Sequence, residues 1–140
     1  LARNQANLII NYKSAEDEAQ AVVAAARDYG VEAAAVQFDV GNYEEVKTEM
    51  ENIMQQFSGL NILVNNAGIR GDNTLLKDIE FEEWKQVINV NLTGTYNCCK
   101  VCQPWLEKDG GKIINITSIA GKMGVTGVCI MLLPRLEFMA

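Results

Sequence analysis

Short apolar segments alternate with helical patterns along this chain, and that alternation constrains the fold more than any other feature. The apolar segments are 6–12, 31–38, 60–65 and 112–117, and their length and composition are typical of buried strands. Helical patterns separate each strand from the next, which favours parallel strands joined by helical crossovers. We therefore predict an α/β fold, a doubly wound parallel sheet with helices on both faces.

Capping residues mark where the first two helices begin and end. Ser14 with Asp17, and Asn42 with Glu45, have the spacing of N-terminal capping pairs. The first helix is expected to end near residue 29, because Gly30 is a natural residue just past a helix. The second is expected to end near residue 57.

A third helical pattern is much longer. It begins near Glu80, and its apolar positions recur at helical spacing. Pro104 lacks a backbone N–H, so we expect it to bend or interrupt the end of this helix. A fourth strand, at 112–117, follows the turn at 109–111.

Composition excludes several classes of function. The net charge is −6 and the sequence pI is about 4.6, so nucleic acid is not an expected partner. No uninterrupted apolar run approaches the roughly 20 residues that cross a bilayer, and no secretory signal is visible at the start. The chain has no histidine, which excludes Ser-His-Asp catalysis and histidine-based metal sites.

Four cysteines remain to be explained: Cys98, Cys99, Cys102 and Cys129. The first three lie on the long predicted helix, where Cys98 and Cys102 share a face. A structural zinc site needs four ligands, and no fourth is near, so we predict buried or interface thiols and no metal. The absence of a disulfide framework suits a reducing compartment, which we expect to be the cytoplasm or the plastid stroma.

Three motifs occur in a telling order: NNAG at 65–68 after an apolar run, NVNLTG at 89–94, and IINITS at 113–118. Together they resemble the short-chain dehydrogenase/reductase family, most closely its bacterial and plastid 3-oxoacyl-ACP reductases. The resemblance extends from residue 1 to about residue 127. It implies a Rossmann-type domain that binds a nicotinamide cofactor.

Part of the family pattern is not found at the start of the chain. The family begins with a strand and a glycine-rich turn, TGxxxGIG, that holds the cofactor's pyrophosphate. Residues 1–3 instead resemble the end of the helix that follows this turn. In the strand order 3-2-1-4-5-6, the absent strand lies between those ending at Tyr12 and Asn65. We therefore interpret 1–127 as a partial NAD(P)-binding domain.

The segment 128–140 is an atypical tail, because the family's YxxxK motif is missing there. One permitted set of codons for this tail, read from the third base, gives YYAASKAGVYG, which contains that motif. Our hypothesis is that the reading frame slipped near Val128, through a sequencing error or a real mutation. The nucleotide sequence tests this, since codons that give the motif in no frame would refute it.

The resemblance assigns cofactor contacts to two strand ends. Asn66, Ala67 and Gly68 are implied to face the adenosine ribose, with a simple strand-ending turn as the alternative. Asp39, with Val40, is implied to accept a hydrogen bond from the adenine amino group. An acid placed favourably at a helix start is the alternative for Asp39.

Cofactor choice is implied to depend on Lys13 and Ser14. An acidic residue after this strand would bind the ribose 2′-hydroxyl and repel a 2′-phosphate. The chain has a cation and a hydroxyl there instead, which favours NADP(H) over NAD(H). A solvated lysine beside an N-cap serine is the alternative.

The resemblance also implies two catalytic residues, Ser118 and Asn91. Ser118 would hold the substrate carbonyl oxygen, while the Asn91 backbone carbonyl would hold a proton-relaying water. Asparagine is unfavourable inside a helix, so its presence at position 91 needs a reason. A helix-bending asparagine that satisfies the core is the alternative for Asn91. Val90 and Ile116 would pack near the cofactor. Without the YxxxK tyrosine and lysine, the chain as written is expected to be inactive.

The function that we predict is NADP(H)-dependent reduction of a carbonyl to a hydroxyl, with 3-oxoacyl-ACP in fatty-acid synthesis as the expected substrate. The alternatives are another dehydrogenase of the family, of glucose, polyol or acetoacetyl-CoA type, and a non-catalytic remnant of a damaged gene. The expected partners are a small-molecule or acyl-thioester substrate and acyl carrier protein. A homo-tetramer or dimer is expected for the full-length protein.

Overall fold

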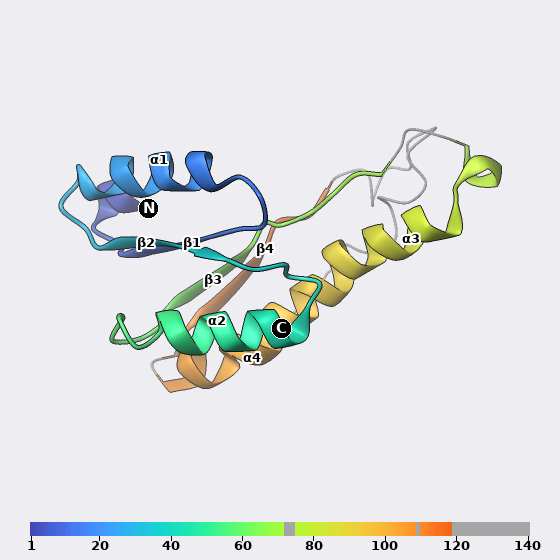
Figure 1. Cartoon of the computed structure of the whole chain (residues 1–140). Coiled ribbons are helices and arrows are strands. Elements are labelled where there is room, and N and C mark those ends of the chain that lie inside the picture. The colour runs from blue at the N-terminus through green and yellow to red at the C-terminus, as the bar shows by residue number, and fades with distance from the viewer. Residues whose placement is uncertain (72–74, 109, 119–140) are drawn as a thin grey trace.

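The computed structural model describes residues 1–71, 75–108 and 110–118 (Figure 1). A short 3-10 helix, Ala2–Asn4, leads into strand β1. Strands and helices then alternate, as the sequence predicts. Within the described residues, no helix has the length and apolar character needed to cross a membrane.

Strands β1 (Leu8–Tyr12) and β2 (Ala33–Gln37) pair in parallel, with Leu8 opposite Ala33 and Tyr12 opposite Gln37. Helix α1 (Glu16–Arg27) covers one face of this pair (Figure 1). Successive strand side chains point to opposite faces, so each strand contributes to two cores. The cluster on the α1 side contains Val23, Ala26, Val31 and Ala33, with Leu8, Ile10 and Ala35 packed against it.

Strands β3 (Ile62–Asn65) and β4 (Lys112–Asn115) form a second parallel pair. Helices α2 (Tyr43–Ile53) and α4 (Gly94–Lys108) lie on the opposite face from α1 (Figure 1). The larger core cluster lies on this side. Its most deeply buried members are Val46, which is fully buried, and Cys102, which is 1% exposed. The predicted α/β arrangement with helices on both faces is therefore confirmed.

The two strand pairs remain separate sheets, in the order β1-β2 and β3-β4. In the described part of the chain, one edge of β1 and one edge of β3 therefore have no strand partner. This division falls where the sequence predicts a strand to be absent, between the strands that end at Tyr12 and Asn65.

The long helix predicted from Glu80 is three segments. Helix α3 (Phe81–Ile88) passes through one π-helical turn, Asn89–Thr93, into α4. Of the two outcomes expected at Pro104, the interruption is wrong, because α4 continues through Pro104 to Lys108, while the bend stays a prediction. A proline deprives the carbonyl four residues earlier of its partner. That residue is Lys100, which is exposed, so water can satisfy its carbonyl.

Other boundaries differ from the predictions by a few residues. Helix α2 ends at Ile53 rather than near residue 57, and β4 ends at Asn115 rather than at residue 117. The chain reverses after α1 through Gly30, whose φ of 78° is a conformation that glycine adopts without steric cost. The tail interpreted as atypical, 128–140, lies outside the described residues.

The two predicted caps have different outcomes. The Asn42 side chain accepts hydrogen bonds from the backbone N–H groups of Glu44 and Glu45, and donates to Glu45 Oε1 at 2.7 Å. This confirms the second capping pair. The first is wrong, because α1 begins at Glu16 with Ala15 as its N-cap and no side-chain capping bond. Ser14 therefore lies one residue too early to cap the helix.

Replacing Asn42 by alanine is expected to lower the free energy of unfolding by about 1 kcal/mol, because two helix N–H groups lose their acceptor. Ser14→Ala is the matched control and should change it by less than about 0.5 kcal/mol. Urea unfolding followed by circular dichroism measures both. Equal effects of the two substitutions would contradict the assignment of the caps.

Candidate functional site

Most of the predicted site residues follow the carboxyl ends of strands. Lys13 and Ser14 come after β1, and Asp39 and Val40 after β2. Residues 66–68 come after β3, and Ile116 and Ser118 after β4. Each strand pair is parallel, so within a pair these residues gather at one edge. In open parallel sheets, ligands bind at this edge.

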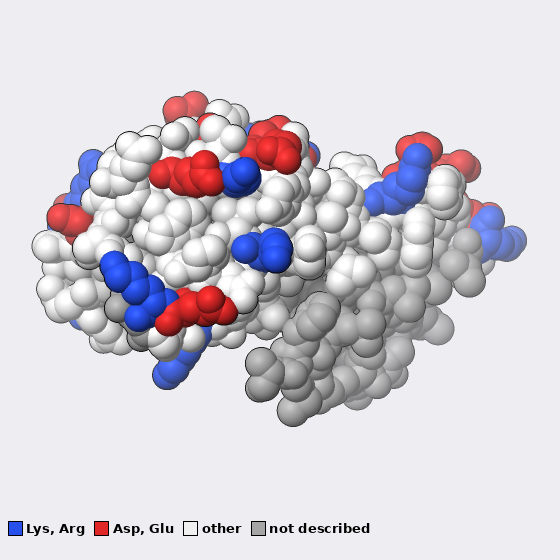
Figure 2. Space-filling model, turned by 90° about the horizontal axis from the view of Figure 1, so that it is seen from below, with Lys and Arg blue, Asp and Glu red and all other residues white. Residues whose placement is uncertain are grey.

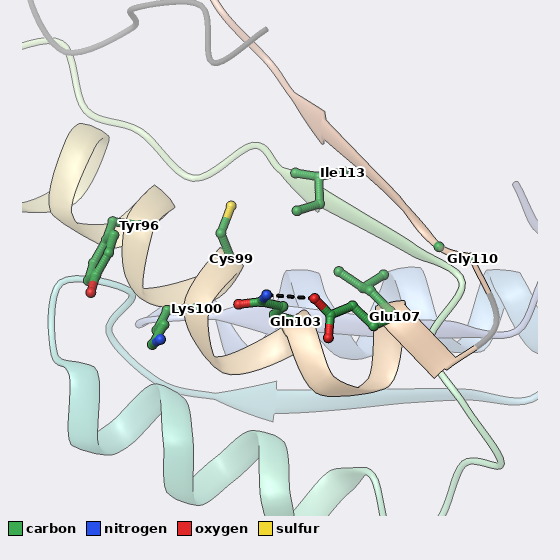
Figure 3. A pocket seen from close by; sticks show the side chains of 9 residues that line it. Tyr96, Cys99, Lys100, Gln103, Glu107, Gly110 and Ile113 are labelled. Carbon is green, nitrogen blue, oxygen red and sulfur yellow. Dashed lines mark hydrogen bonds between the residues drawn. The ribbon is translucent and has the colours of Figure 1, made fainter. Parts of the chain in front are cut away.

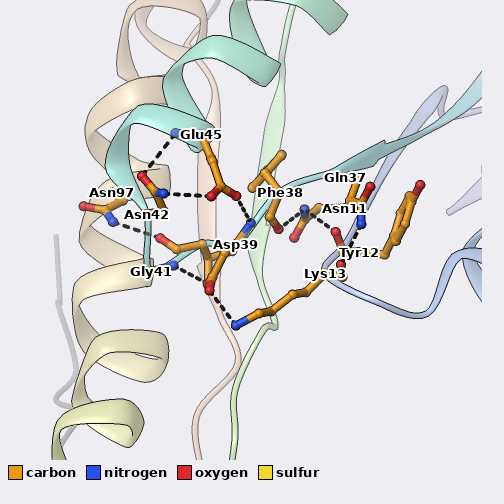
Figure 4. Close-up of polar contacts among 11 residues, drawn as sticks. Asn11, Tyr12, Lys13, Gln37, Phe38, Asp39, Gly41, Asn42, Glu45 and Asn97 are labelled. Carbon is orange, nitrogen blue, oxygen red and sulfur yellow. Dashed lines mark hydrogen bonds and ion pairs between the residues drawn. The ribbon is translucent and has the colours of Figure 1, made fainter.

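Lys13 and Asp39 contact each other directly (Figure 4). The hydrogen bond from Phe38 N to Tyr12 O continues the β1–β2 ladder and brings the two strand ends together. Lys13 Nζ lies 2.5 Å from Asp39 Oδ2. Their side chains are 63% and 24% exposed, so a charged pair lies at the surface of this edge.

The Asp39 carboxylate is held by more than the lysine. Its Oδ1 accepts a hydrogen bond from Gly41 N at 2.9 Å, and the Asp39 N–H donates to Glu45 Oε2 at 2.9 Å (Figure 4). The hydrogen bond from Lys13 is the main cause that lowers the pKa of Asp39 below its ordinary value of 3.8, and the Gly41 N–H adds to it, while partial burial opposes both.

The lowered pKa of Asp39 predicts a pH dependence of stability. A carboxylate with a depressed folded-state pKa stabilises the fold above its unfolded pKa, about 3.9, and loses that contribution as the pH falls through the folded value. Asp39→Asn should therefore flatten the fall in stability below about pH 4. Urea midpoints across pH measure this, with Glu44→Gln as a control of equal charge change. Parallel curves for Asp39→Asn and the unsubstituted chain would contradict it.

The turn after β3 is open to a ligand. Asn66, Ala67 and Gly68 are all exposed, and two of the three have small side chains or none. The preceding Asn65 points elsewhere, because its Nδ2 donates to Asn115 Oδ1 at 2.9 Å and to Cys99 Sγ at 3.3 Å. Asn65 therefore ties β3 to β4 and to α4.

Asn91 lies in the π turn and is only 4% exposed. Its side-chain amide bonds both backbone groups of one residue: Oδ1 accepts from Ile69 N, and Nδ2 donates to Ile69 O, each at 2.8 Å. The Asn91 carbonyl accepts from Thr95 Oγ1 at 2.9 Å. Asn91 therefore fixes the backbone just beyond the open turn. The buried amide is satisfied, as the core-satisfying alternative requires.

A second buried asparagine, Asn97, was not singled out from the sequence. It is 3% exposed, and its Nδ2 donates to Val40 O at 2.8 Å (Figure 4). The sequence signal that could have identified Asn97 is an asparagine inside a predicted helix, where this residue is unfavourable. The same signal drew attention to Asn91. One turn earlier, Gly94 lies so close to Val40 that a Cβ built on it would be 2.6 Å from Val40 Cγ2. These contacts pack α4 against the end of β2.

The remaining predicted residues lie near these elements. Val90 is partly buried against the larger core, and Ile116 is 43% exposed. Ile116 N donates to Asn65 O at 3.0 Å, which continues the β3–β4 ladder toward the half-buried Ser118. Cys98 and Cys102 are buried, as predicted, and burial is the main cause that raises the pKa of each thiol to about 12.

A cavity in the described part of the chain lies apart from this edge. It measures about 530 Å³ and lies between α4 and the start of β4, lined by Tyr96, Cys99, Lys100, Gln103, Leu106, Glu107, Gly110, Gly111 and Ile113 (Figure 3). No predicted site residue lines it. On the face seen from below, basic and acidic side chains are mixed rather than gathered into one patch (Figure 2).

The residues present fit the adenosine half of a dinucleotide. A cation and a carboxylate lie side by side after the ends of β1 and β2, and these are groups to which a phosphate and an amino group can bond. An exposed turn with little side-chain bulk lies after β3, where backbone can approach a flat ligand closely. Among the described residues, no group of three potential metal ligands occurs.

This arrangement is the Rossmann-type α/β class, and solved structures with the same fold confirm it. An NAD+-bound xylitol dehydrogenase superposes with a TM-score of 0.90 at 23% identity, covering 96% of this chain and 52% of that one. A 3-ketoacyl-ACP reductase from Sinorhizobium meliloti gives 0.87 at 26% identity, covering 94% and 52%. Residues 1–130 match the family model of the short chain dehydrogenases. The chain belongs to the short-chain dehydrogenase family.

Its relatives include 3-oxoacyl-[acyl-carrier-protein] reductases. That of Staphylococcus epidermidis is 43% identical over 128 residues, which is 91% of this chain and 52% of the relative. That of Synechocystis is 43% identical over 128 residues, 91% of this chain and 51% of the relative. A 3beta-hydroxysteroid dehydrogenase of Mediterraneibacter gnavus is 35% identical over 109 residues, 78% and 40%. The chain spans about half the length of the curated relatives it matches.

Proposed function

We propose that this chain carries the adenosine-binding part of an NADP(H)-dependent reductase that converts a carbonyl to a hydroxyl group. The 3-oxoacyl thioesters, carried by acyl carrier protein, are the proposed substrates, in the cytoplasm or the plastid stroma. The observation that carries the proposal is the contact between Lys13 and Asp39 after the ends of β1 and β2, together with the exposed turn 66–68 after the end of β3. The 3-oxoacyl-[acyl-carrier-protein] reductases among the relatives support the substrate class.

The proposed adenosine contacts follow from charge and exposure. Lys13 would attract the 2′-phosphate, with the Ser14 hydroxyl as a second donor, while Asp39 would accept from the adenine amino group. Both Lys13 and Ser14 are exposed. Asn66, Ala67 and Gly68 would lie against the ribose. Val90, which is partly buried, would present apolar surface beside these groups, and Val40, whose side chain is buried in the larger core, would support them from within the fold.

The catalytic roles proposed for this chain are limited to orientation. The Ser118 hydroxyl would hold the substrate's carbonyl oxygen by a hydrogen bond, beside apolar surface from Ile116. Asn91 would position the turn after β3 through its two bonds to Ile69. When bound, the nicotinamide supplies the hydride. A proton must also reach the nascent alkoxide, and a neutral serine hydroxyl is too weak an acid to supply it alone at neutral pH.

The 140-residue chain itself is expected to lack turnover, because no tyrosine or lysine follows Lys122 in its sequence. NADPH oxidation with acetoacetyl-CoA, followed at 340 nm, measures this. The matched control is a gene in which the frame is restored to give YYAASKAGVYG and the coding region is extended on both sides. Turnover by the 140-residue chain well above background would contradict the expected inactivity. No activity in the restored protein would contradict the reductase assignment.

A non-catalytic nucleotide-binding remnant is the second candidate, and the tail without the tyrosine–lysine pair favours it. Both the reductase and the non-catalytic remnant would bind a nucleotide, whereas a purely structural fragment would not. Both predict that millimolar NADPH shifts the amide resonances of Asn66, Ala67 and Gly68 in an NMR titration. Assembly into a dimer or tetramer remains a prediction for the full-length protein.

A further inference from the structure

The two side chains that we assign to adenosine recognition are bonded to each other in this structure. Lys13 Nζ lies 2.5 Å from Asp39 Oδ2 (Figure 4). A lysine ammonium in this position already has a carboxylate as its counter-ion. A 2′-phosphate that approaches the same ammonium must compete with that carboxylate.

Asp39 is the fixed member of the pair. Its Oδ1 accepts from Gly41 N, its N–H donates to Glu45, and its carbonyl accepts from Asn42 N, all at 2.9 Å. These three bonds come from the loop and the helix that follow β2. The bond from Gly41 holds the carboxylate itself and the other two hold the Asp39 backbone, whether or not the lysine is bound to the carboxylate.

Lys13 is the adaptable member. Gln37 Nε2 donates to the Lys13 carbonyl at 3.0 Å, which fixes its backbone beside the end of β2. Its side chain is 63% exposed. A flexible four-carbon stem carries the ammonium group, which has three N–H donors. The ammonium can therefore move from one acceptor to another without moving the strand.

We propose that Asp39 sets the preference for a phosphorylated cofactor by competing with the 2′-phosphate for Lys13, an inference that rests on the proposed function. When a 2′-phosphate binds, Lys13 turns from Asp39 Oδ2 to the phosphate. Asp39 stays in place and can accept from the adenine amino group whether or not Lys13 is bound to it, because a carboxylate has several acceptor positions. When the ligand has a 2′-hydroxyl instead, the Lys13–Asp39 pair stays closed.

The balance of charges makes this exchange feasible. An exposed ion pair contributes little, whereas a phosphate monoester carries a charge of about −1.5 to −2 at neutral pH. The phosphate should therefore win the ammonium, but with an affinity reduced by the competing carboxylate. Lys13 thus creates the preference for a nucleotide with a 2′-phosphate, and Asp39 limits the size of that preference.

The test compares two nucleotides that differ only in the 2′-phosphate: adenosine 2′,5′-bisphosphate and adenosine 5′-monophosphate. Their dissociation constants are measured by NMR titration of the 140-residue chain, and the ratio of the two constants reports the preference. Asp39→Asn keeps an acceptor for adenine and should strengthen the preference by about two- to five-fold. Lys13→Met should bring the ratio to about one. Asp39→Asn added to Lys13→Met should then have no effect on the ratio.

Glu44→Gln is the matched control, because it removes one negative charge from an exposed side chain nearby. It should leave the ratio close to that of the unsubstituted chain. If Asp39→Asn behaves like Glu44→Gln, or keeps its effect in the Lys13→Met background, the competition is refuted while nucleotide binding stands. If neither nucleotide shifts any amide at millimolar concentration, the proposed function itself fails. Lys13→Met alters an exposed side chain, so a ratio that it leaves unchanged overturns the inference even where Asp39→Asn does not fold.

Discussion

Replacing Gly94 by valine is expected to lower the free energy of unfolding by about 3 kcal/mol, because overpacking a close contact forces the backbone or neighbouring side chains to shift. A Cβ at this position would lie 2.6 Å from Val40 Cγ2 and 3.0 Å from Val40 Cβ. Urea unfolding followed by tryptophan fluorescence measures the change. The loss should appear as a lower midpoint with an unchanged slope.

Two further variants test whether the contact with Val40 is the cause. Tyr96→Val places the same β-branched side chain on an exposed site of α4, so it should cost less than about 1 kcal/mol. Val40→Ala removes the obstructing methyl groups, so Gly94→Val should cost less in that background. Additive effects of the two substitutions would show that the destabilisation has another origin.

Replacing Asn91 by alanine is expected to cost about 2 kcal/mol of stability, since two hydrogen bonds to the Ile69 backbone are lost and the vacated site is buried. The effect should be local as well as global. Amide exchange at Ile69 should accelerate more than exchange at the centre of β1, because Asn91 Oδ1 is the acceptor of that N–H.

The Asn91→Asp variant tests the two hydrogen bonds to Ile69 separately. It keeps an acceptor for Ile69 N and removes the donor to Ile69 O, while it adds a charge to a site that is 4% exposed. Its destabilisation should therefore grow as the pH rises through the pKa of the new carboxyl. Gln86→Ala, an exposed amide on α3, is the control and should be close to neutral. Uniform acceleration of exchange in Asn91→Ala would contradict a specific role in holding the turn.

The sequence predicted the elements well because their signals are local. Strand β1 and its helix α1 follow from a short apolar run and a helical pattern, and Asn42 caps α2 as its spacing with Glu45 predicted. Ser14 was misjudged because a capping pair is a weak local signal. The actual start of α1 depends on how the chain leaves β1, which packing decides.

The site was predicted in part. Residue types at strand ends are readable from sequence, so Lys13, Asp39 and the turn 66–68 could be named. Their contacts could not, because the Lys13–Asp39 pair and the Asn91–Ile69 bonds join residues far apart in the chain. The π turn was also hidden, since its apolar spacing differs little from that of an ordinary helix.

That π turn contains one residue more than an ordinary helical turn, because the Gly94 N–H bonds to the carbonyl of Asn89, five residues back. In a regular helix, one added residue would rotate every later residue by about 100° around the axis. The wider π turn takes up the extra residue within itself, so Asn97 and Cys98 keep their places in the core. The irregularity is therefore confined to Asn89–Thr93, the stretch that contains the Asn91 side chain bonded to Ile69.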